Sequence, residues 1–408
     1  MYKQVFKFDF KDKDKDITMG LIKPSYKIVF PTRNGSFKNQ WESCLEQLQS
    51  ISANPKESLT RVNVFVHSDN QADYLVKQDI VSSMFRDSYG EFCPPFGVVM
   101  QEPEDPYMVI CEVGFVENQN AKVSYGMFKE IPYCIVDTSN YKEYWTVGAH
   151  SVNPEMGILQ QSNAAFSYLN ELYLHLGLSL NNIVRQWNYV GEILNNEKSE
   201  GRLRQHYQMF NEVRSEYYGK FRTRTDFPAA TGIGMLFRGV CIDSFAVSGD
   251  DKLKIIPISN PVQSESYCYS QEVLVGHPNQ NRNQNQPPQF ERAKLLVLNG
   301  VSRLFVSGTA SIVGQKTIGI GDVEEQTRVT IENIKRLADP VHLRNLCPEI
   351  INFPDKYTYI RVYIKSKNDI SKVKTICKKF FEDVPATYVV ADICRNDLLV
   401  EIEAELIS

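Results

Sequence analysis

Apolar residues recur along this chain either with the period of a strand or with the period of a helix. In two parts of the chain, stretches of these two kinds follow one another in the same order. In residues 298–408 the patterns predict strands over 303–306, 359–364 and 398–403, and helices over 326–337 and about 370–381. Residues 157–248 predict the same order: a helix opened by Gln160 and Gln161, a strand over 182–190, a helix over about 203–218 and a strand over 227–234. This repetition indicates a duplicated strand–helix–strand unit, and pockets form where copies of such a unit meet.

The first 145 residues form a separate region with a fainter version of the pattern. Residues 1–10 and 59–66 alternate as strands, and residues 41–51 fit an amphipathic helix. The alternating charges of residues 11–16 indicate a solvated turn. Because the strand at 59–66 resembles the strand at 359–364, and each precedes a helical stretch and a proline-containing turn, we interpret this region as a third, degraded copy.

These patterns predict an α/β fold with mixed sheets. The expected domains are residues 1–145, 146–275 and 289–408, and the polar run 279–288 is expected to be a surface loop between the last two. Strands that alternate in polarity and alternate with helices indicate mixed sheets covered by helices on one face. The other face of each sheet needs a cover, so we expect a homotrimer with pockets between subunits, or else a solvent-filled channel.

Composition narrows the class of protein. The 408 residues include 42% hydrophobic and 23% charged residues and carry a formal net charge of −4, which gives no sign of nucleic-acid binding. No apolar run approaches the roughly 18 residues that cross a bilayer, and the N-terminus reads as a strand rather than a signal peptide. The nine cysteines form no CxxC pair, so we expect reduced thiols in a cytoplasmic protein.

Short segments resemble the RidA (YjgF) superfamily, which has a chorismate-mutase-like fold and is typically trimeric. They are Gln326–Thr327 at a helix start, the run Gly177 to Val184, and the strand Val400 to Glu403. Other segments resemble one branch of it, the chorismatases, and these are residues 185–189, 207–214, 227–234 with 305–314, and 391–403. The resemblance covers about residues 145–408.

This resemblance implies a hydrolase that cleaves the enol ether of chorismate. The expected products are pyruvate and either a hydroxybenzoate or a dihydroxycyclohexadiene carboxylate, with no metal and no cofactor. The two substrate carboxylates suit the planar fork of arginine. Cleavage of an enol ether needs a proton on the terminal methylene carbon, and a carboxylic acid kept neutral by a dry pocket supplies one.

Glu401 and Cys394 are the catalytic candidates. Glu401 has the apolar neighbours Leu399, Val400 and Ile402, so burial is expected to raise the pKa of its carboxyl, and the resemblance points to the same residue. Alternatively, Glu401 and Glu403 lie on a solvated sheet face. The resemblance associates a cysteine at position 394 with hydroxybenzoate-forming members and a nucleophilic role, whereas a lone cysteine is most often a small core residue.

The substrate-binding candidates are Arg214, Arg185, Tyr207, Gly308, Thr309 and Ala310. Arg214 shares one helical face with Tyr207 and Phe210, although a surface arginine would fit the same pattern. Arg185 precedes Trp187 in a strand whose orientation the sequence does not define. Residues 308–310 are small and follow a strand, so their backbone N–H groups are expected to approach an anion, unless they form only a tight turn. Arg395 is a further candidate in a turn-like segment.

Two segments depart from the chorismatase pattern. Residues 314–321 lack histidines, and residues 260–269 lack basic side chains. These departures favour the alternative function, a small-molecule-binding or structural member of the RidA superfamily without catalysis. Thr387 and Ala230 stand where RidA-type imine deaminases would have an arginine, which argues against that activity. The six histidines show no metal-ligand spacing, and no phosphate-binding loop is present.

Overall fold

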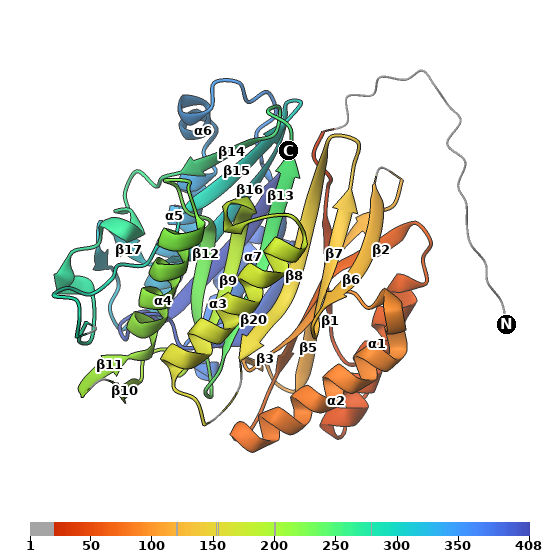
Figure 1. Ribbon diagram of the computed structural model, residues 1–408, viewed down its shortest axis with the longest axis horizontal. Helices are drawn as coiled ribbons and strands as arrows, with labels where there is room; N and C mark the ends of the chain where they lie inside the picture. The colour runs from red at the N-terminus through yellow and green to blue at the C-terminus, as the bar shows by residue number, and fades with distance from the viewer. Residues whose placement is uncertain (1–19, 120, 152, 154, 200, 279) are drawn as a thin grey trace.

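A computed structural model describes residues 20–408 except 120, 152, 154, 200 and 279. The expected strand at residues 1–10 and charged turn at 11–16 lie outside the described residues. Three mixed sheets form the interior, and helices lie at the outside of the molecule (Figure 1). The predicted fold class, an α/β protein with helices on one face of mixed sheets, is confirmed.

The chain folds into three consecutive units, each built on one of these sheets. The first unit comprises β1 (Ser25–Val29), α1 (Phe37–Ser52), β2 (Glu57–Val66), α2 (Gln71–Tyr89), β3 (Phe96–Val99) and β5 (Val109–Glu117). The second comprises β6 (Lys122–Phe128), β7 (Ile131–Asp137), β8 (Tyr141–Ser151), α3 (Ile158–His175), β9 (Ile183–Gly191), α4 (His206–Phe221), β12 (Ala229–Met235) and β13 (Val240–Gly249).

The third unit ends the chain. It comprises β14 (Lys254–Ile258), β15 (Ala293–Leu298), β16 (Val301–Ala310), α5 (Val323–Leu337), α6 (Pro340–Leu346), β19 (Lys356–Ile364), α7 (Ile370–Phe381), β20 (Ala386–Val390) and β21 (Val400–Ile407). Smaller strands are β4 (Glu102–Pro103), which pairs with β20, and the hairpins β10 (Asn196–Ser199) with β11 (Arg202–Gln205) and β17 (Ile312–Val313) with β18 (Lys316–Thr317).

All three sheets have the same pairing scheme. In each unit the final strand lies between two antiparallel neighbours, the strand that opens the helical part and the middle strand. The final strands are β5, β13 and β21, their opening-strand neighbours are β1, β8 and β16, and their middle-strand neighbours are β2, β9 and β19. The middle strand then pairs in parallel with the strand that follows the second helix. Residues 25–117 therefore repeat the arrangement of the other two units.

The sheets divide the chain at other points than the expected domains. Strands β6 and β7 precede residue 146 yet pair in the second sheet, and β14 precedes residue 289 yet pairs in the third. Residues 280–288 belong to a long connection between β14 and β15. We therefore propose unit boundaries near residues 120 and 250.

Local signals account for where the helices lie. The Asp322 side chain accepts hydrogen bonds from the backbone N–H groups of Glu324 and Glu325 and begins α5. Helix α7 spans the predicted residues, and Val373, Ile376, Cys377 and Phe381 form its buried face. That stripe packs into the apolar core between the helices and the third sheet.

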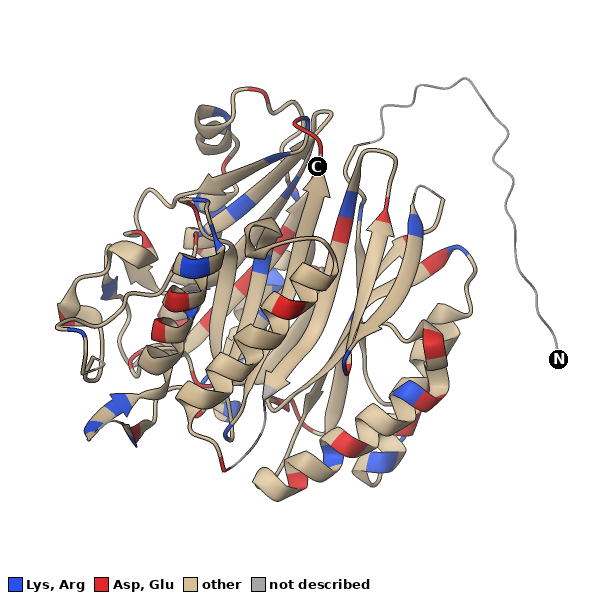
Figure 2. Cartoon of the chain, in the orientation of Figure 1, with Lys and Arg blue, Asp and Glu red and all other residues tan. Residues whose placement is uncertain are grey.

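The opposite, inner faces of the three sheets meet at the centre and are polar. Each final strand places one carboxylate opposite one residue of its middle strand: Glu112 opposite Asn63, Asp243 opposite Trp187, and Glu403 opposite Arg361. All six side chains are buried. Figure 2 shows charged residues along the outer helices and also as isolated bands on strands.

Each of the three carboxylates is bound by a neighbouring unit, and we call this group the central polar cluster. Arg361 Nε and Thr387 Oγ1 donate to Glu112 at 2.9 Å each, Asn63 Nδ2 donates to Asp243 at 2.6 Å, and Trp187 Nε1 donates to Glu403 at 2.6 Å. The contacts form a closed ring, because the third unit binds the first, the first binds the second, and the second binds the third. Buried carboxylates of this kind are tolerated only when paired.

This ring bears on the expected homotrimer. That expectation rested on a sheet face that nothing in the same chain covers. Here the inner face of each sheet is covered by the other two units of one chain, so that reason for a trimer of chains does not apply.

Candidate active site

A cavity lies where the second unit meets the third. It is lined by Tyr207, Ala230, Gly232, Tyr269, Pro288, Phe290, Arg292, Gly308, Ala310, Ile312, Cys394, Arg395, Leu398 and Glu401. The second unit contributes α4 and β12, and the third contributes β16, β21 and two connecting segments. Several residues singled out from the sequence are thus brought together here.

Glu401 forms part of the floor of this cavity. It lies on β21 opposite Ala310 of β16, and it is 4% exposed. Burial, and the nearby Glu403 carboxylate, raise the pKa of Glu401 to about 8, while Arg185 and Arg292 act in the opposite direction. No described residue donates a hydrogen bond to its carboxyl group. Glu401 is therefore a buried, neutral acid near pH 7 with a free carboxyl.

Gly308 leaves the space that the Glu401 carboxyl occupies. The pairing of β16 with β21 shifts between Val306 and Thr309, which makes a bulge at Gly308. A Cβ atom on Gly308 would lie 2.0 Å from Glu401 Oε1. The Gly308 N–H donates to Thr231 Oγ1 at 3.0 Å, and Thr309 is buried with its hydroxyl on the Ser307 carbonyl. Residues 308–310 thus end a strand, and the expected anion-binding turn is corrected to a bulge that admits Glu401.

Arg292 and Arg395 supply positive charge next to Tyr269. The centres of their guanidinium groups lie 5.5 and 4.9 Å from the Tyr269 ring centroid. Arg292 NH2 donates to the Tyr269 hydroxyl at 2.8 Å and to the Ser264 carbonyl, and Arg395 NH1 donates to the Gln315 carbonyl at 2.7 Å. Arg292 Nε and Arg395 NH2 are buried and have no partner among the described residues. Both guanidinium groups can therefore donate hydrogen bonds to a carboxylate ligand.

Arg214 lies behind the cavity wall. It is fully buried on α4, and its NH2 donates to Asn211 Oδ1 at 2.6 Å. Its Nε and NH1 have no partner among the described residues. Tyr207, two helical turns before Arg214, lines the cavity. Burial raises the pKa of the Tyr207 hydroxyl, while Arg214 lowers it. Arg214 is thus a buried cation that contacts the cavity through Tyr207, and the alternative of a surface arginine is wrong.

Arg185 does not line the cavity. Its NH2 donates to Glu403 Oε2 at 2.8 Å and to Thr231 Oγ1 at 2.6 Å, and the guanidinium stacks 4.6 Å from the Trp187 ring centroid. The guanidinium is therefore held in the central polar cluster. This placement corrects the expected contact of Arg185 with substrate, because its fork is bound to a protein carboxylate.

Cys394 lines the cavity close to Glu401. Its thiol is partly buried, and burial, followed by the Glu401 charge, raises the pKa of the thiol to about 12. The thiol therefore keeps its proton near pH 7, and it is a weak nucleophile until a base removes that proton. Among the described residues, no cluster of three His, Cys, Asp or Glu side chains is arranged to hold a metal ion.

Arg292, Tyr269 and Phe290 line the cavity but are not among the site residues predicted from the sequence. The segment 260–269 lacks basic residues, and Arg292 supplies the cation from the start of the next strand. Ser266 Oγ holds the two segments together, because it donates to the Pro288 and Phe290 carbonyls at 2.9 and 2.7 Å. The one available signal was an arginine directly before an apolar strand. No helix in the described part of the chain is long and apolar enough to cross a membrane.

Comparison with known proteins relates this geometry to a family. A family model for the N-terminal part of FkbO/Hyg5-like chorismatases matches residues 134–246. A 3-hydroxybenzoate synthase from Streptomyces hygroscopicus is 33% identical over 264 residues, which are 62% of this chain and 72% of that protein. A chorismatase from Streptomyces rapamycinicus is 34% identical over 226 residues, which are 54% of this chain and 63% of that protein.

A solved structure extends the likeness to the whole fold. The crystal structure of a chorismatase superposes with a TM-score of 0.66 at 22% identity, and the match covers 94% of this chain and 98% of that one. This coverage includes most of the first unit, which the sequence resemblance did not reach. Since identity above 30% extends over more than two thirds of a relative, the chain belongs to the chorismatase family.

Proposed function

We propose that this protein is an enzyme that cleaves the enol ether of chorismate and releases pyruvate. One observation carries the proposal: a carboxyl group that is neutral near pH 7, Glu401, faces a cavity lined by two arginines. The names of the relatives, chorismatase and 3-hydroxybenzoate synthase, support chorismate as the substrate. The alternative of a non-catalytic binding protein rested on missing cations, and Arg292 and Arg395 provide them.

The first step is transfer of the Glu401 proton to the terminal methylene carbon of the enol ether. The carbon that bears the ether oxygen then becomes a cation, and Glu401 becomes a carboxylate. Its negative charge stabilises that cation, and it then serves as a base for the group that attacks next. A dry cavity favours this cycle because it keeps the acid protonated before the reaction.

Arg292, Arg395 and Arg214 are the proposed carboxylate binders. Chorismate carries two carboxylates, and Arg292 and Arg395 each have a buried nitrogen without a described partner. Arg214 acts through Tyr207, which lines the cavity. Arg185 has a positioning role, because it holds Glu403, whose charge contributes to the raised pKa of Glu401.

Two product sets balance. Addition of one water gives pyruvate and a dihydroxycyclohexadiene carboxylate. Without net water, pyruvate and a hydroxybenzoate together contain all the atoms of chorismate. We propose the hydroxybenzoate, because the Cys394 thiol lies beside Glu401 and can lose its proton to the newly formed carboxylate. Chromatography of the aromatic product from wild type and Cys394→Ala tests this choice, since the variant should form the dihydroxy acid instead.

The test of the proposed function is a coupled assay for pyruvate with chorismate as substrate. Glu401→Gln keeps the shape of the side chain but cannot supply the proton, so pyruvate release should fall by roughly two to four orders of magnitude. Chorismate binding by calorimetry should persist in this variant. If the wild type binds chorismate but releases no pyruvate, the binding-protein alternative takes the place of the enzyme.

A further inference from the structure

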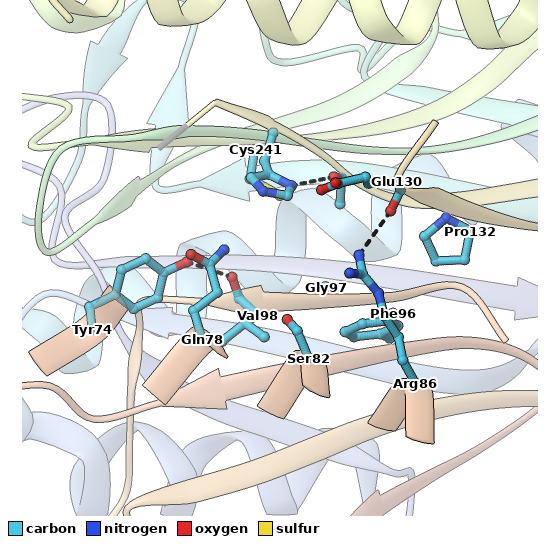
Figure 3. Close-up of a pocket in the computed structure, with 12 residues that line it drawn as sticks. Tyr74, Gln78, Ser82, Arg86, Phe96, Gly97, Val98, Glu130, Pro132 and Cys241 are labelled. Atoms are coloured by element: carbon cyan, nitrogen blue, oxygen red, sulfur yellow. Dashed lines mark hydrogen bonds between the residues drawn. The ribbon is translucent and has the colours of Figure 1, made fainter. Parts of the chain in front are cut away.

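A second cavity lies where the first unit meets the second. It is lined by Tyr74, Gln78, Ser82, Arg86, Phe96, Gly97, Val98, Glu130, Pro132, Gly148, His150 and Cys241. Helix α2 contributes four of these residues at four-residue intervals, so they share one face. Figure 3 shows Gln78, Ser82 and Arg86 extending from α2 towards Cys241 and the segment that holds Glu130 and Pro132.

The position of this cavity repeats that of the candidate active site. Cys241 lies two residues before Asp243, as Glu401 lies two residues before Glu403. Cys241 pairs with His150 of β8, and Glu401 pairs with Ala310 of β16. Phe96 and Val98 of β3 likewise occupy the places of Ala230 and Gly232 of β12 in the parallel pairing. The fold thus builds the same hollow twice with different side chains.

Arg86 gives this second cavity a cation that is available to a ligand. Its NH2 donates to the Glu130 carbonyl at 3.1 Å, and its guanidinium lies over the Phe96 ring at 5.9 Å (Figure 3). Its Nε is buried without a partner, and no described carboxylate forms an ion pair with it. Glu130 is a lining residue whose backbone carbonyl accepts this hydrogen bond, and the residue is exposed to solvent.

The other groups that face the cavity add no negative charge within it. Burial and the adjacent Asp243 raise the pKa of the Cys241 thiol, so it is neutral. Asp243 itself is bound by Asn63 and by the Gly148 N–H at 2.8 Å. The His150 Nδ1–H donates to the Gly148 carbonyl at 2.7 Å, and the other ring nitrogen, Nε2, takes no part in this hydrogen bond. Phe96, Val98 and Pro132 provide apolar walls.

We propose that this second cavity binds a small cyclic monocarboxylate, with the carboxylate on Arg86 and the ring against Phe96 and Pro132. One arginine suits one carboxylate, whereas the candidate active site has several arginines for two. The cavity has a thiol where the candidate active site has Glu401, so it holds no proton donor for an enol ether. It is therefore a binding site and not a second catalytic site.

Calorimetry of the full chain with benzoate tests this site. Arg86→Gln should weaken benzoate binding by about tenfold or more, since it removes the charge-assisted hydrogen bond. Ser82→Phe should abolish the same binding by filling the cavity. Arg292→Gln, in the candidate active site, is the matched control and should leave this binding unchanged. Thermal unfolding of each variant shows that it is folded.

The outcomes separate clearly. Binding that is lost in the Arg86 and Ser82 variants but kept in the Arg292 variant supports the second site, as does a stoichiometry of two with one site lost per variant. The proposal is overturned if the folded Arg86 and Ser82 variants bind benzoate with the same stoichiometry and the same affinity as wild type. It is also overturned if the wild type shows no binding at benzoate concentrations up to about 10 mM, because a Kd above this value means negligible affinity.

Discussion

Burial raises the pKa of Glu401, and Glu403, two residues along the same strand, raises it further. The two side chains point to the same face of β21, and both are buried. Glu403 is bound by Arg185 and Trp187, whereas no described residue hydrogen-bonds to the Glu401 carboxyl. A paired carboxylate and a free acid thus lie side by side, and the environment separates their roles.

The pH dependence of turnover follows from this pair. Because the pKa of Glu401 is raised to about 8, the acid is protonated below that pH and loses its proton above it. We expect kcat/KM for chorismate to be level near pH 7 and to fall about tenfold per unit well above pH 8. Measurement of initial rates of pyruvate release across this range checks the prediction. A rate that rises through pH 8 would mean that the carboxylate acts first as a base.

The same group affects folding stability in a defined pH window. The pKa of Glu401 is higher in the folded chain than its ordinary value of 4.5. Below about pH 4.5 both states hold the proton. Between about 4.5 and 8 the unfolded state releases it first, so the folded state loses stability as pH rises, by up to a few kcal/mol. Urea unfolding of wild type and Glu401→Gln should therefore converge towards low pH and diverge towards pH 8, with the variant more stable.

Gly308→Ala should damage catalysis more than folding. The new methyl group would lie 2.0 Å from Glu401 Oε1 and 2.9 Å from Thr231 Cγ2, so the acid must move. We expect kcat to fall by roughly tenfold or more, because a shift of about 1 Å at a reacting group has effects of this order. Gly219→Ala on α4 is the matched control, since a methyl group there meets nothing within 4 Å. Equal rates in both variants would place the reacting acid elsewhere.

Arg292→Lys tests carboxylate binding. Lysine keeps the charge but lacks the two-pronged fork, and a charge-assisted hydrogen bond is worth about 1.5–3 kcal/mol. We expect KM for chorismate to rise by roughly tenfold to a hundredfold, with a smaller change in kcat. Arg33→Lys, at an exposed ion pair with Glu46, is the control and should change neither constant. The thermal midpoint of the Arg292 variant must stay near that of wild type for this interpretation.

The mass of the protein in solution tests whether the three units of one chain cover the inner sheet faces without a second chain. Since the inner sheet faces cover one another within one chain, we expect light scattering to give the mass of one chain, 46.8 kDa, at micromolar concentration. Three times this mass would support the homotrimer that the sequence alone suggested. The measurement should be repeated over a tenfold range of concentration.

The sequence predicted the elements well because their patterns are local. The helix at residues 370–381 has the predicted bounds, since its apolar stripe and the turns at both ends define it. Strand 303–306 extends further, to Val301–Ala310, because pairing with β15 begins at Val301 and pairing with β21 resumes at Thr309 and Ala310 after the bulge. The small residues there read as a turn from the sequence, and only the partner strand shows that they form a bulge.

The candidate site was harder to predict because it depends on which face a side chain takes. Arg185 and Arg292 are both buried arginines near strands, but Arg185 points to the central polar cluster and Arg292 to the cavity. No local pattern separates them. Cys394 and Glu401 lie seven residues apart in one segment, so a short match could find both, whereas the Ser266 contacts that position Arg292 join distant parts of the chain.

Joining three units in one chain changes what a single substitution does. In a ring of identical chains, every substitution appears three times around the axis, and each contact face must suit all three positions. Here the place of Glu401 is taken by Cys241 in the second unit and by Ile110 in the first. A mutation at one contact face therefore leaves the other two faces unchanged. Each face can acquire different catalytic or binding side chains without destabilising the other two.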